Sequence, residues 1–245
     1  MIKFFRHIRR SLINQNKTGK YLKYAIGEIL LVVIGILIAL QINNWNENRK
    51  TKQIEVTKLN KLLEDLKLDS IAFDSNIKVL STIDNLHQQL YNIGYKNSNE
   101  QLTENPKNIR RYVPFNPPSQ KTSILLVSQL NNETIRKELI DYNENISTSS
   151  TEMDEFINIV KDKIRPYLGL KEVYNLPSQF ETFSTKESNM ISKDDLIAIS
   201  RNPDFQQLLF EANFKLKSNI NGIKNMLLTQ NSNLRNLITN ELKNY

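Results

Sequence analysis

Cysteine is absent from this chain and histidine occurs twice, and the spacing of the other titratable residues does not gather them into a site. An enzyme needs an activated nucleophile, an acid–base pair or a set of metal ligands. The sequence has no cysteine and contains no glycine-rich phosphate loop and no GxSxG or HExxH motif. Its two histidines, His7 and His87, lie on opposite sides of the apolar stretch 24–45. We therefore expect no enzyme, no cofactor and no metal site.

The acidic pairs have a structural interpretation. Asp194 and Asp195 follow a serine in the pattern of a capping box, and Glu64 and Asp65 lie on a helix with an apolar face elsewhere. His87 occupies a position of a seven-residue apolar repeat, so we interpret it as a packed residue and not as a ligand. These residue types therefore predict no reaction, and the predicted helices that carry them are more informative about function.

The stretch from Tyr24 to Trp45 is a predicted transmembrane helix. From Ile29 to Leu40 it contains no polar residue. The two aromatic residues lie about 31 Å apart along a helix axis, which is the separation of the two interfacial aromatic belts. Tyr21, Tyr24 and Trp45 are the predicted interface anchors. The alternative is a buried helix of a soluble core, which needs a shorter apolar run.

The position of the positive charges predicts the topology. The chain has a formal charge of +7, and the basic residues before the helix account for all of it. Residues 24–245 are therefore neutral as a whole, which argues against binding nucleic acid. By the positive-inside rule, the basic residues before the helix hold the N-terminus in the cytoplasm. The topology-setting residues are Lys3, Arg6, Arg9, Arg10, Lys17, Lys20 and Lys23.

We expect the apolar stretch to be an uncleaved signal anchor. A cleaved signal peptide needs small residues at its cleavage site, whereas this run ends in Ala39-Leu40-Gln41-Ile42-Asn43. The predicted location is the bacterial inner (cytoplasmic) membrane, with a single pass. Residues 1–23 then form a basic cytoplasmic segment, which either lies on the anionic inner leaflet or only sets the orientation. Residues 46–245 form a periplasmic, or extracytoplasmic, domain.

One face of the predicted anchor has the pattern of a helix–helix contact. Glu28, Val32, Gly35 and Ala39 follow the spacing i, i+4, i+7, i+11, which places them on one side of a helix. Gly35 and Ala39 form a small-xxx-small pair, the type that lets two membrane helices approach closely. We expect this face to pack laterally, either against a second copy of the chain or against another envelope protein.

The block GKYLKYAIGEILLVVIGILIALQINNWNENRK, residues 19–50, resembles the N-terminal signature of an uncharacterised bacterial family of single-pass inner-membrane proteins. The resemblance includes Glu28, Gly35 and the exit sequence from Gln41 to Asn46. A weaker similarity runs through Ile135-Arg136, Leu139 and Tyr142. The resemblance implies a location and a domain type, and it carries over no activity and no catalytic residue.

The remainder predicts an all-α fold, an antiparallel bundle of long amphipathic helices that follows the transmembrane helix. Apolar residues recur every seven positions after the anchor, which favours coiled-coil packing: Leu59, Leu66, Phe73 and Leu80, then His87. A proline-rich loop is expected at 94–120, a short helix at 121–130, and an Asn132-capped helix that Pro166 stops. After an irregular stretch at 169–188, helices begin at Ser192 and Asn202 and continue to the C-terminus.

Two non-enzymatic functions remain open. The first is a protein-interaction or scaffolding role in the cell envelope, with the lipid bilayer as a further partner. The second is a sensory or ligand-binding bundle that acts through a separate partner protein. A cavity lined by convergent polar groups favours ligand sensing, and a solid core with an exposed apolar patch favours a protein partner.

The predicted packing face is testable by one substitution. Gly35→Ile places a branched side chain where close helix approach needs a small one, so we expect self-association to fall in a membrane two-hybrid assay. Association that is unchanged by the substitution would rule the face out.

Overall fold

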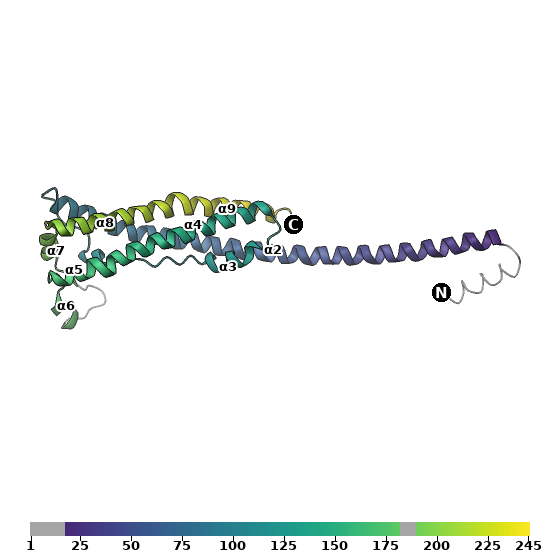
Figure 1. Ribbon diagram of the computed structural model, residues 1–245, viewed down its shortest axis with the longest axis horizontal. Helices are drawn as coiled ribbons and strands as arrows, with labels where there is room; N and C mark the ends of the chain where they lie inside the picture. The colour runs from purple at the N-terminus through teal and green to yellow at the C-terminus, as the bar shows by residue number, and fades with distance from the viewer. Residues whose placement is uncertain (1–17, 182–189) are drawn as a thin grey trace. The chain divides into compact units, whose positions relative to one another are not determined.

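The computed structural model describes residues 18–181 and 190–245 and is entirely helical within those ranges apart from connecting segments (Figure 1). A single isolated bridge, between Tyr174 and Ile191, is the only β-type pairing there. The all-α prediction is confirmed. The elements are α2 (Thr18–Gly94), η1 (Pro106–Arg110), α3 (Ser119–Val127), α4 (Glu133–Asn158), η2 (Ile159–Ile164), α5 (Arg165–Leu170), α6 (Leu176–Phe180), α7 (Lys193–Ser200), α8 (Pro203–Asn221), η3 (Gly222–Leu227) and α9 (Leu228–Leu242).

The chain divides into two compact units, Met1–Val56 and Thr57–Tyr245. Helix α2 supplies residues to both, because no glycine or proline occurs between Gly35 and Gly94 to break it. In the first unit, the apolar side chains of α2 from Ile26 to Ile42 are exposed. In the second unit, α2 buries one face.

The buried face of α2 is the predicted seven-residue repeat. Its apolar members are at most 1% exposed and belong to one hydrophobic core: Leu59, Leu62, Leu66, Phe73, Leu80, Ile83 and Leu90. The opposing faces come from α4 and from the run α8–η3–α9, which pack on each other along their lengths (Figure 1). The repeat therefore predicted the core of the second unit correctly.

Helices α2 and α4 run in the same direction, and α8–η3–α9 run antiparallel to both. Lys58 of α2 donates to the Gln129 carbonyl just before α4, and further along α2 Asp69 accepts from Tyr142 of α4, so the two helices advance together. The contacts with α8 and α9 run in the opposite order, because Gln206 bonds to Leu90 and Asn231 bonds to Leu66. Two long helices can be parallel neighbours only if the chain returns between them. The segment 95–118 makes that return.

The returning segment packs against α2 instead of forming a free loop. Gln89 accepts hydrogen bonds from the backbone N–H groups of Thr103 and Glu104, and the Phe115 ring stacks on Phe73 with 5.8 Å between centroids. Four apolar residues of the segment are buried: Leu102, Ile109, Val113 and Phe115. Apart from the short helix η1, its backbone is therefore held by side-chain hydrogen bonds and apolar burial.

The three predicted helix caps are present. The side chains of Asn132, Ser192 and Asn202 accept the backbone N–H groups two or three residues ahead, at 3.0, 3.3 and 2.9 Å, as N-caps do. The predicted stop at Pro166 is wrong. The helix widens into the π-helical η2, where the Arg165 N–H donates to the Val160 carbonyl, and this longer turn accommodates the proline and continues through α5. The predicted irregular stretch after it contains the short helix α6.

The C-terminal end of α2 needs a glycine. A Cβ atom placed on Gly94 would lie 2.0 Å from the backbone oxygen of Ser200 at the end of α7. No side chain fits at that distance, so the glycine is required for the close approach of the two helix ends.

A hydrogen-bonded polar cluster lies inside the second unit. Asp69 is fully buried; its Oδ2 accepts the Tyr142 hydroxyl at 2.8 Å and its Oδ1 accepts the Ser119 N–H at 2.9 Å. Asn231 donates to the Tyr142 hydroxyl at 3.2 Å and to the Leu66 carbonyl at 2.8 Å. One carboxylate thus joins α2, α3 and α4, and the tyrosine extends the cluster to α9. Burial raises the pKa of Asp69 above its ordinary value of 3.8, against the opposing effect of the hydrogen bonds that it accepts.

This raised pKa makes stability depend on pH in a defined direction. Because folded Asp69 holds its proton more tightly than unfolded Asp69, its contribution is fully present below the unfolded pKa of 3.8 and is lost as the pH rises through the folded pKa. The amide side chain of the Asp69→Asn variant does not titrate. We expect the wild-type free energy of unfolding to fall relative to that of the variant as the pH rises from about 4 to about 8.

Urea unfolding of the full chain, followed by circular dichroism in an uncharged detergent, measures this difference. Parallel pH profiles for the two proteins, or a wild type that gains stability relative to the variant, would contradict the assigned pKa direction.

Candidate functional site

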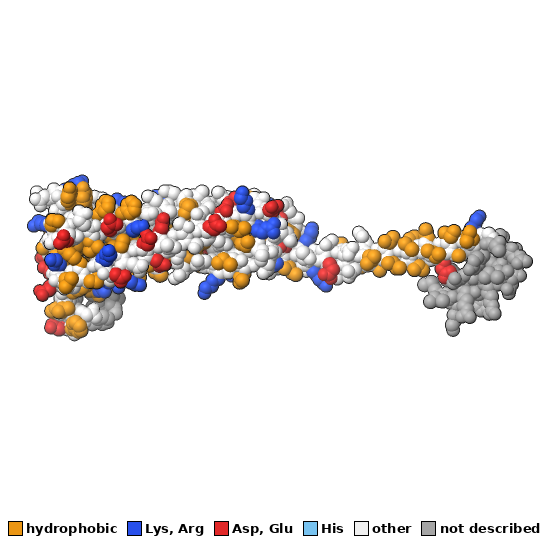
Figure 2. Space-filling view, viewed as in Figure 1, with side chains coloured by type: hydrophobic (Ala, Val, Ile, Leu, Met, Phe, Trp, Pro, Cys, Tyr) orange, Lys and Arg blue, Asp and Glu red, His pale blue; other side chains and the backbone are white. Residues whose placement is uncertain are grey.

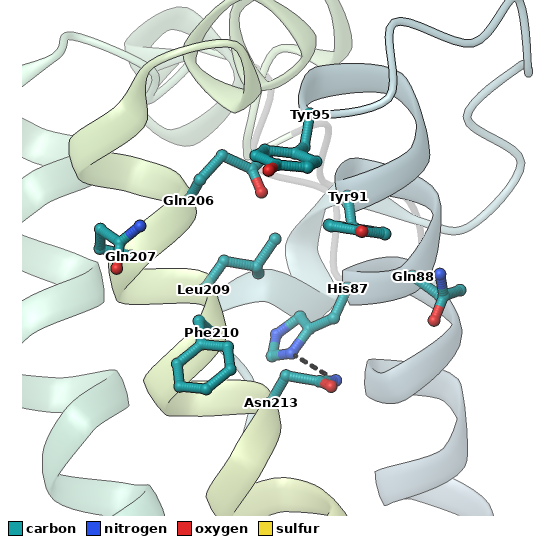
Figure 3. A pocket seen from close by; sticks show the side chains of 9 residues that line it. All are labelled: His87, Gln88, Tyr91, Tyr95, Gln206, Gln207, Leu209, Phe210 and Asn213. Atoms are coloured by element: carbon teal, nitrogen blue, oxygen red, sulfur yellow. Dashed lines mark hydrogen bonds between the residues drawn. The ribbon is translucent and has the colours of Figure 1, made fainter.

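The second unit has a cleft between α2 and α8 with a volume of about 500 Å³. Figure 3 shows side chains from the two helices facing each other across it. We call it the aromatic cleft, and its lining residues are His87, Gln88, Tyr91, Tyr95, Gln206, Gln207, Leu209, Phe210 and Asn213. None of these nine side chains is acidic or carries a fixed positive charge, so the cleft suits an uncharged group.

Helical spacing places these residues in two rows. His87 and Tyr91 are four residues apart at the end of α2, and Tyr95 follows at the same spacing one residue beyond the helix. Gln206 and Phe210 are four apart on α8, so each row lies on one side. The Tyr91 and Tyr95 rings stack with 5.3 Å between centroids. Tyr95 is 70% exposed and Phe210 is 63% exposed, so the cleft presents aromatic rings to the solvent.

Amide side chains connect the walls of the cleft. The Gln206 amide donates to the carbonyls of Ser200 and Leu90, at 2.5 and 3.4 Å, and so links α8 to the ends of α7 and α2. The Asn213 amide donates to Asp84 Oδ1 at 2.8 Å. These bonds fix the two walls and leave the Gln206 side-chain oxygen as an acceptor.

His87 lies at the inner end of the aromatic cleft and is 2% exposed. Its Nδ1 is 3.5 Å from the Asn213 amide nitrogen, and its Nε2 has no hydrogen-bond partner in the described part of the chain. Burial, with a smaller contribution from the Lys217 charge, lowers the pKa of His87 from 6.5 to about 3. The imidazole is therefore neutral at physiological pH. The prediction that it is a packed residue is confirmed, and the ring also lines the cleft.

The chemistry of the aromatic cleft comes from uncharged side chains. The described residues contain no cluster of three or more histidine, cysteine or acidic side chains able to hold a metal ion. The cleft offers a neutral imidazole, amides and aromatic rings, which supply hydrogen bonds and apolar contact.

The predicted anchor residues belong to α2, and the structure describes the side chain of one of them, Trp45. Trp45 is 65% exposed, with the Arg49 guanidinium 5.6 Å from its ring centroid. Lys23 is exposed. Lys3, Arg6, Arg9, Arg10 and Lys17 lie outside the described residues, as do the side chains of Lys20, Tyr21 and Tyr24.

The predicted packing face lies on one uninterrupted helix. Glu28, Val32, Gly35 and Ala39 all belong to α2, and a Cβ atom on Gly35 would meet no described atom within 4 Å. Val32 is 56% exposed. No described residue covers this face at Gly35, and its association with a partner stays a prediction.

Sequence reasoning did not identify the aromatic cleft. One signal was available: Phe210 and Phe214 fall outside the apolar row of α8 that contains Phe205, Leu209 and Ala212, and both are more than half exposed. Large aromatic residues on the polar side of an amphipathic helix indicate a surface with a function. The packing of α8 against the end of α2 depends on the tertiary fold and cannot be predicted from local sequence spacing.

The fold is that of a helical bundle with a long apolar N-terminal helix. Residues 28–147 match the model of a family described as "Family of unknown function (DUF6090)". The resemblance to an uncharacterised family is therefore confirmed. No curated protein matches the chain, and no solved structure does. The family match ends within α4, so the α8 wall of the cleft lies beyond it.

The low pKa of His87 is directly measurable. The chain contains two histidines, so His7→Asn leaves His87 as the sole imidazole. We expect its ring chemical shifts to stay constant between about pH 5 and pH 8, because the burial cost keeps the ring neutral. Titration of the full-length variant in detergent, followed by NMR, provides the measurement. A titration with a midpoint near the ordinary value would contradict the buried, neutral state.

Proposed function

We propose that this protein is a single-pass membrane protein whose bundle lies outside the cytoplasm and binds another protein of the cell envelope. The membrane part is supported by α2, the one helix in the described part of the chain that is long and apolar enough to cross a bilayer. None of its most apolar stretch is buried, which is unlike the core helix of a soluble protein. Figure 2 shows apolar side chains covering this part of α2.

The proposed orientation follows from charge. The basic residues before the apolar stretch favour an uncleaved signal anchor with a cytoplasmic N-terminus, in the inner membrane of a bacterium. Trp45 marks the outer interface in this proposal, and the bundle follows it on the extracytoplasmic side. Residues 24–45 are then the transmembrane segment.

The proposed interaction role rests on the exposed rings of the aromatic cleft. The core of the bundle is filled by apolar residues that are almost completely buried. Tyr95 and Phe210 of the cleft, and Phe214 one turn further along α8, are at least 60% exposed. Tyrosine and phenylalanine are enriched at the centres of protein interfaces, and charged residues are depleted there. The absence of charged side chains from the lining fits that composition. The role is not enzymatic.

A second candidate function, binding of a small uncharged ligand for sensing, is favoured by a different observation. His87, Gln206 and Asn213 converge on the cleft, and His87 Nε2 has no partner in the described part of the chain. Convergent polar groups in a cleft of this size are typical of small-molecule sites. The bundle would then need a partner to transmit the signal.

Site-specific photocrosslinking distinguishes these candidates. Replacing Phe210 by p-benzoylphenylalanine in full-length protein in intact membranes should give one discrete protein adduct. Ile71 is the matched control, because it is 65% exposed against 63% for Phe210 and does not line the cleft. We expect Tyr95→Ala in the same protein to reduce the adduct by about 3-fold or more, since it removes an exposed ring from the same surface.

Identical adducts from positions 71 and 210, or no protein adduct from position 210 in correctly folded protein, would contradict the interaction role. In the second case, the small-ligand candidate is retained.

A further inference from the structure

A second cleft, distinct from the aromatic cleft, has a strongly basic lining. It is open to solvent, has a volume of about 480 Å³, and is formed by η1, the two residues that follow it, α5 and a residue shortly before α7: Lys107, Arg110, Arg111, Tyr112, Arg165 and Met190. We call it the basic cleft. Four of its six lining residues carry a positive charge, although residues 24–245 as a whole are neutral.

Two of the four cations of the basic cleft, Arg110 and Arg165, are positioned by aromatic rings and by a carbonyl group. Arg165 donates through Nε and Nη2 to the Arg110 carbonyl, at 3.3 and 2.9 Å. Its guanidinium lies 5.1 Å from the Tyr112 ring centroid, and the Arg110 guanidinium lies 5.4 Å from that of Tyr174. Cation–π contacts hold a guanidinium in place without neutralising its charge.

No carboxylate neutralises these groups in the described part of the chain. The ion pairs found there involve other lysines, namely Lys50, Lys61, Lys215 and Lys217. Arg165 uses two of its five N–H groups on the carbonyl, which leaves three as donors. The Lys107 and Arg111 side chains are exposed. Like charges brought together in this way repel each other until an anion enters.

We propose that the basic cleft binds the phosphate group of an anionic ligand. A guanidinium presents paired donors that match the oxygens of a phosphate, and several cations suit a dianion better than a single carboxylate. The Tyr112 ring lines the cleft beside the Arg165 guanidinium, where it offers apolar contact to an organic part of the ligand. This phosphate site is additional to the proposed interaction role, which does not require it.

Calorimetric titration of the full-length protein in an uncharged detergent at low salt tests this site, with inorganic phosphate as the first probe. The double variant Lys107→Gln/Arg111→Gln removes two exposed cations that take no part in the hydrogen bonds of Arg165, so it leaves those bonds intact. The matched control is Lys67→Gln/Lys78→Gln, which removes the same charge from α2, outside the cleft. We expect the cleft variant to weaken phosphate binding about 10-fold and the control to change it less than about 2-fold.

Two further probes identify the source and the chemistry of the anion. Glycerol 1-phosphate binding more tightly than inorganic phosphate indicates a phosphate carried on an organic group; equal affinity indicates free phosphate, and both support the site. Acetate binding as tightly as phosphate would overturn the assignment to phosphate. No phosphate binding to the wild type, or equal weakening by the cleft and control variants, would overturn the site itself. None of these outcomes depends on the aromatic cleft or on a protein partner.

Discussion

The apolar surface of α2 between Ile26 and Ile42 is the constraint on which the rest depends. Its large aliphatic side chains are about half exposed or more, and burying each one is worth about 1.5–3 kcal/mol. A helix satisfies its own backbone hydrogen bonds, so a bilayer can receive this surface without leaving polar groups unpaired. Such a surface in water would drive association instead. The proposed side of the membrane for every other residue follows from a bilayer covering this surface.

Inside the bundle, one buried carboxylate and its partners connect α2, α3, α4 and α9 by directional hydrogen bonds, which apolar packing does not supply. Leucine and isoleucine positions tolerate a shift of one helix against another, because their contacts are not directional. Asp69 accepts from Tyr142 and Ser119 at once, and Asn231 completes the set from α9. These bonds form together in one register of α2, α4 and α9. A partly formed network would leave polar groups buried without partners, at a cost of about 1–3 kcal/mol each.

The features that were predictable from the sequence are those that depend on local pattern. The repeat from Leu59 to Leu90 has helical spacing, so its burial followed directly, and the caps at Asn132 and Asn202 act within one turn. The parallel course of α2 and α4 was not predictable, because it depends on where segment 95–118 packs. Asp69 lies seven residues after the buried Leu62, where the spacing favours another apolar residue, and its partners lie far along the chain. The helix continues beyond Pro166 because it widens into the π-helical η2, and no residue pattern predicts that turn.

The same reasoning separates the two clefts. Each wall of the aromatic cleft has local helical spacing, but the pairing of the walls is tertiary. The basic cleft was hidden by the neutral charge of the domain, because a sum over residues carries no information on where cations converge. The packing face of Glu28, Val32, Gly35 and Ala39 is different, since a single helix brings these residues together.

Topology is the property on which the proposed location and role both rest, and it is measured most directly with a reporter enzyme that is active only outside the cytoplasm. Fused after Tyr245, the reporter should be active in intact cells. Fused before Met1, it should be inactive although the fusion protein is present in the membrane fraction. Activity of the N-terminal fusion with silence of the C-terminal one would contradict a cytoplasmic N-terminus and an extracytoplasmic bundle.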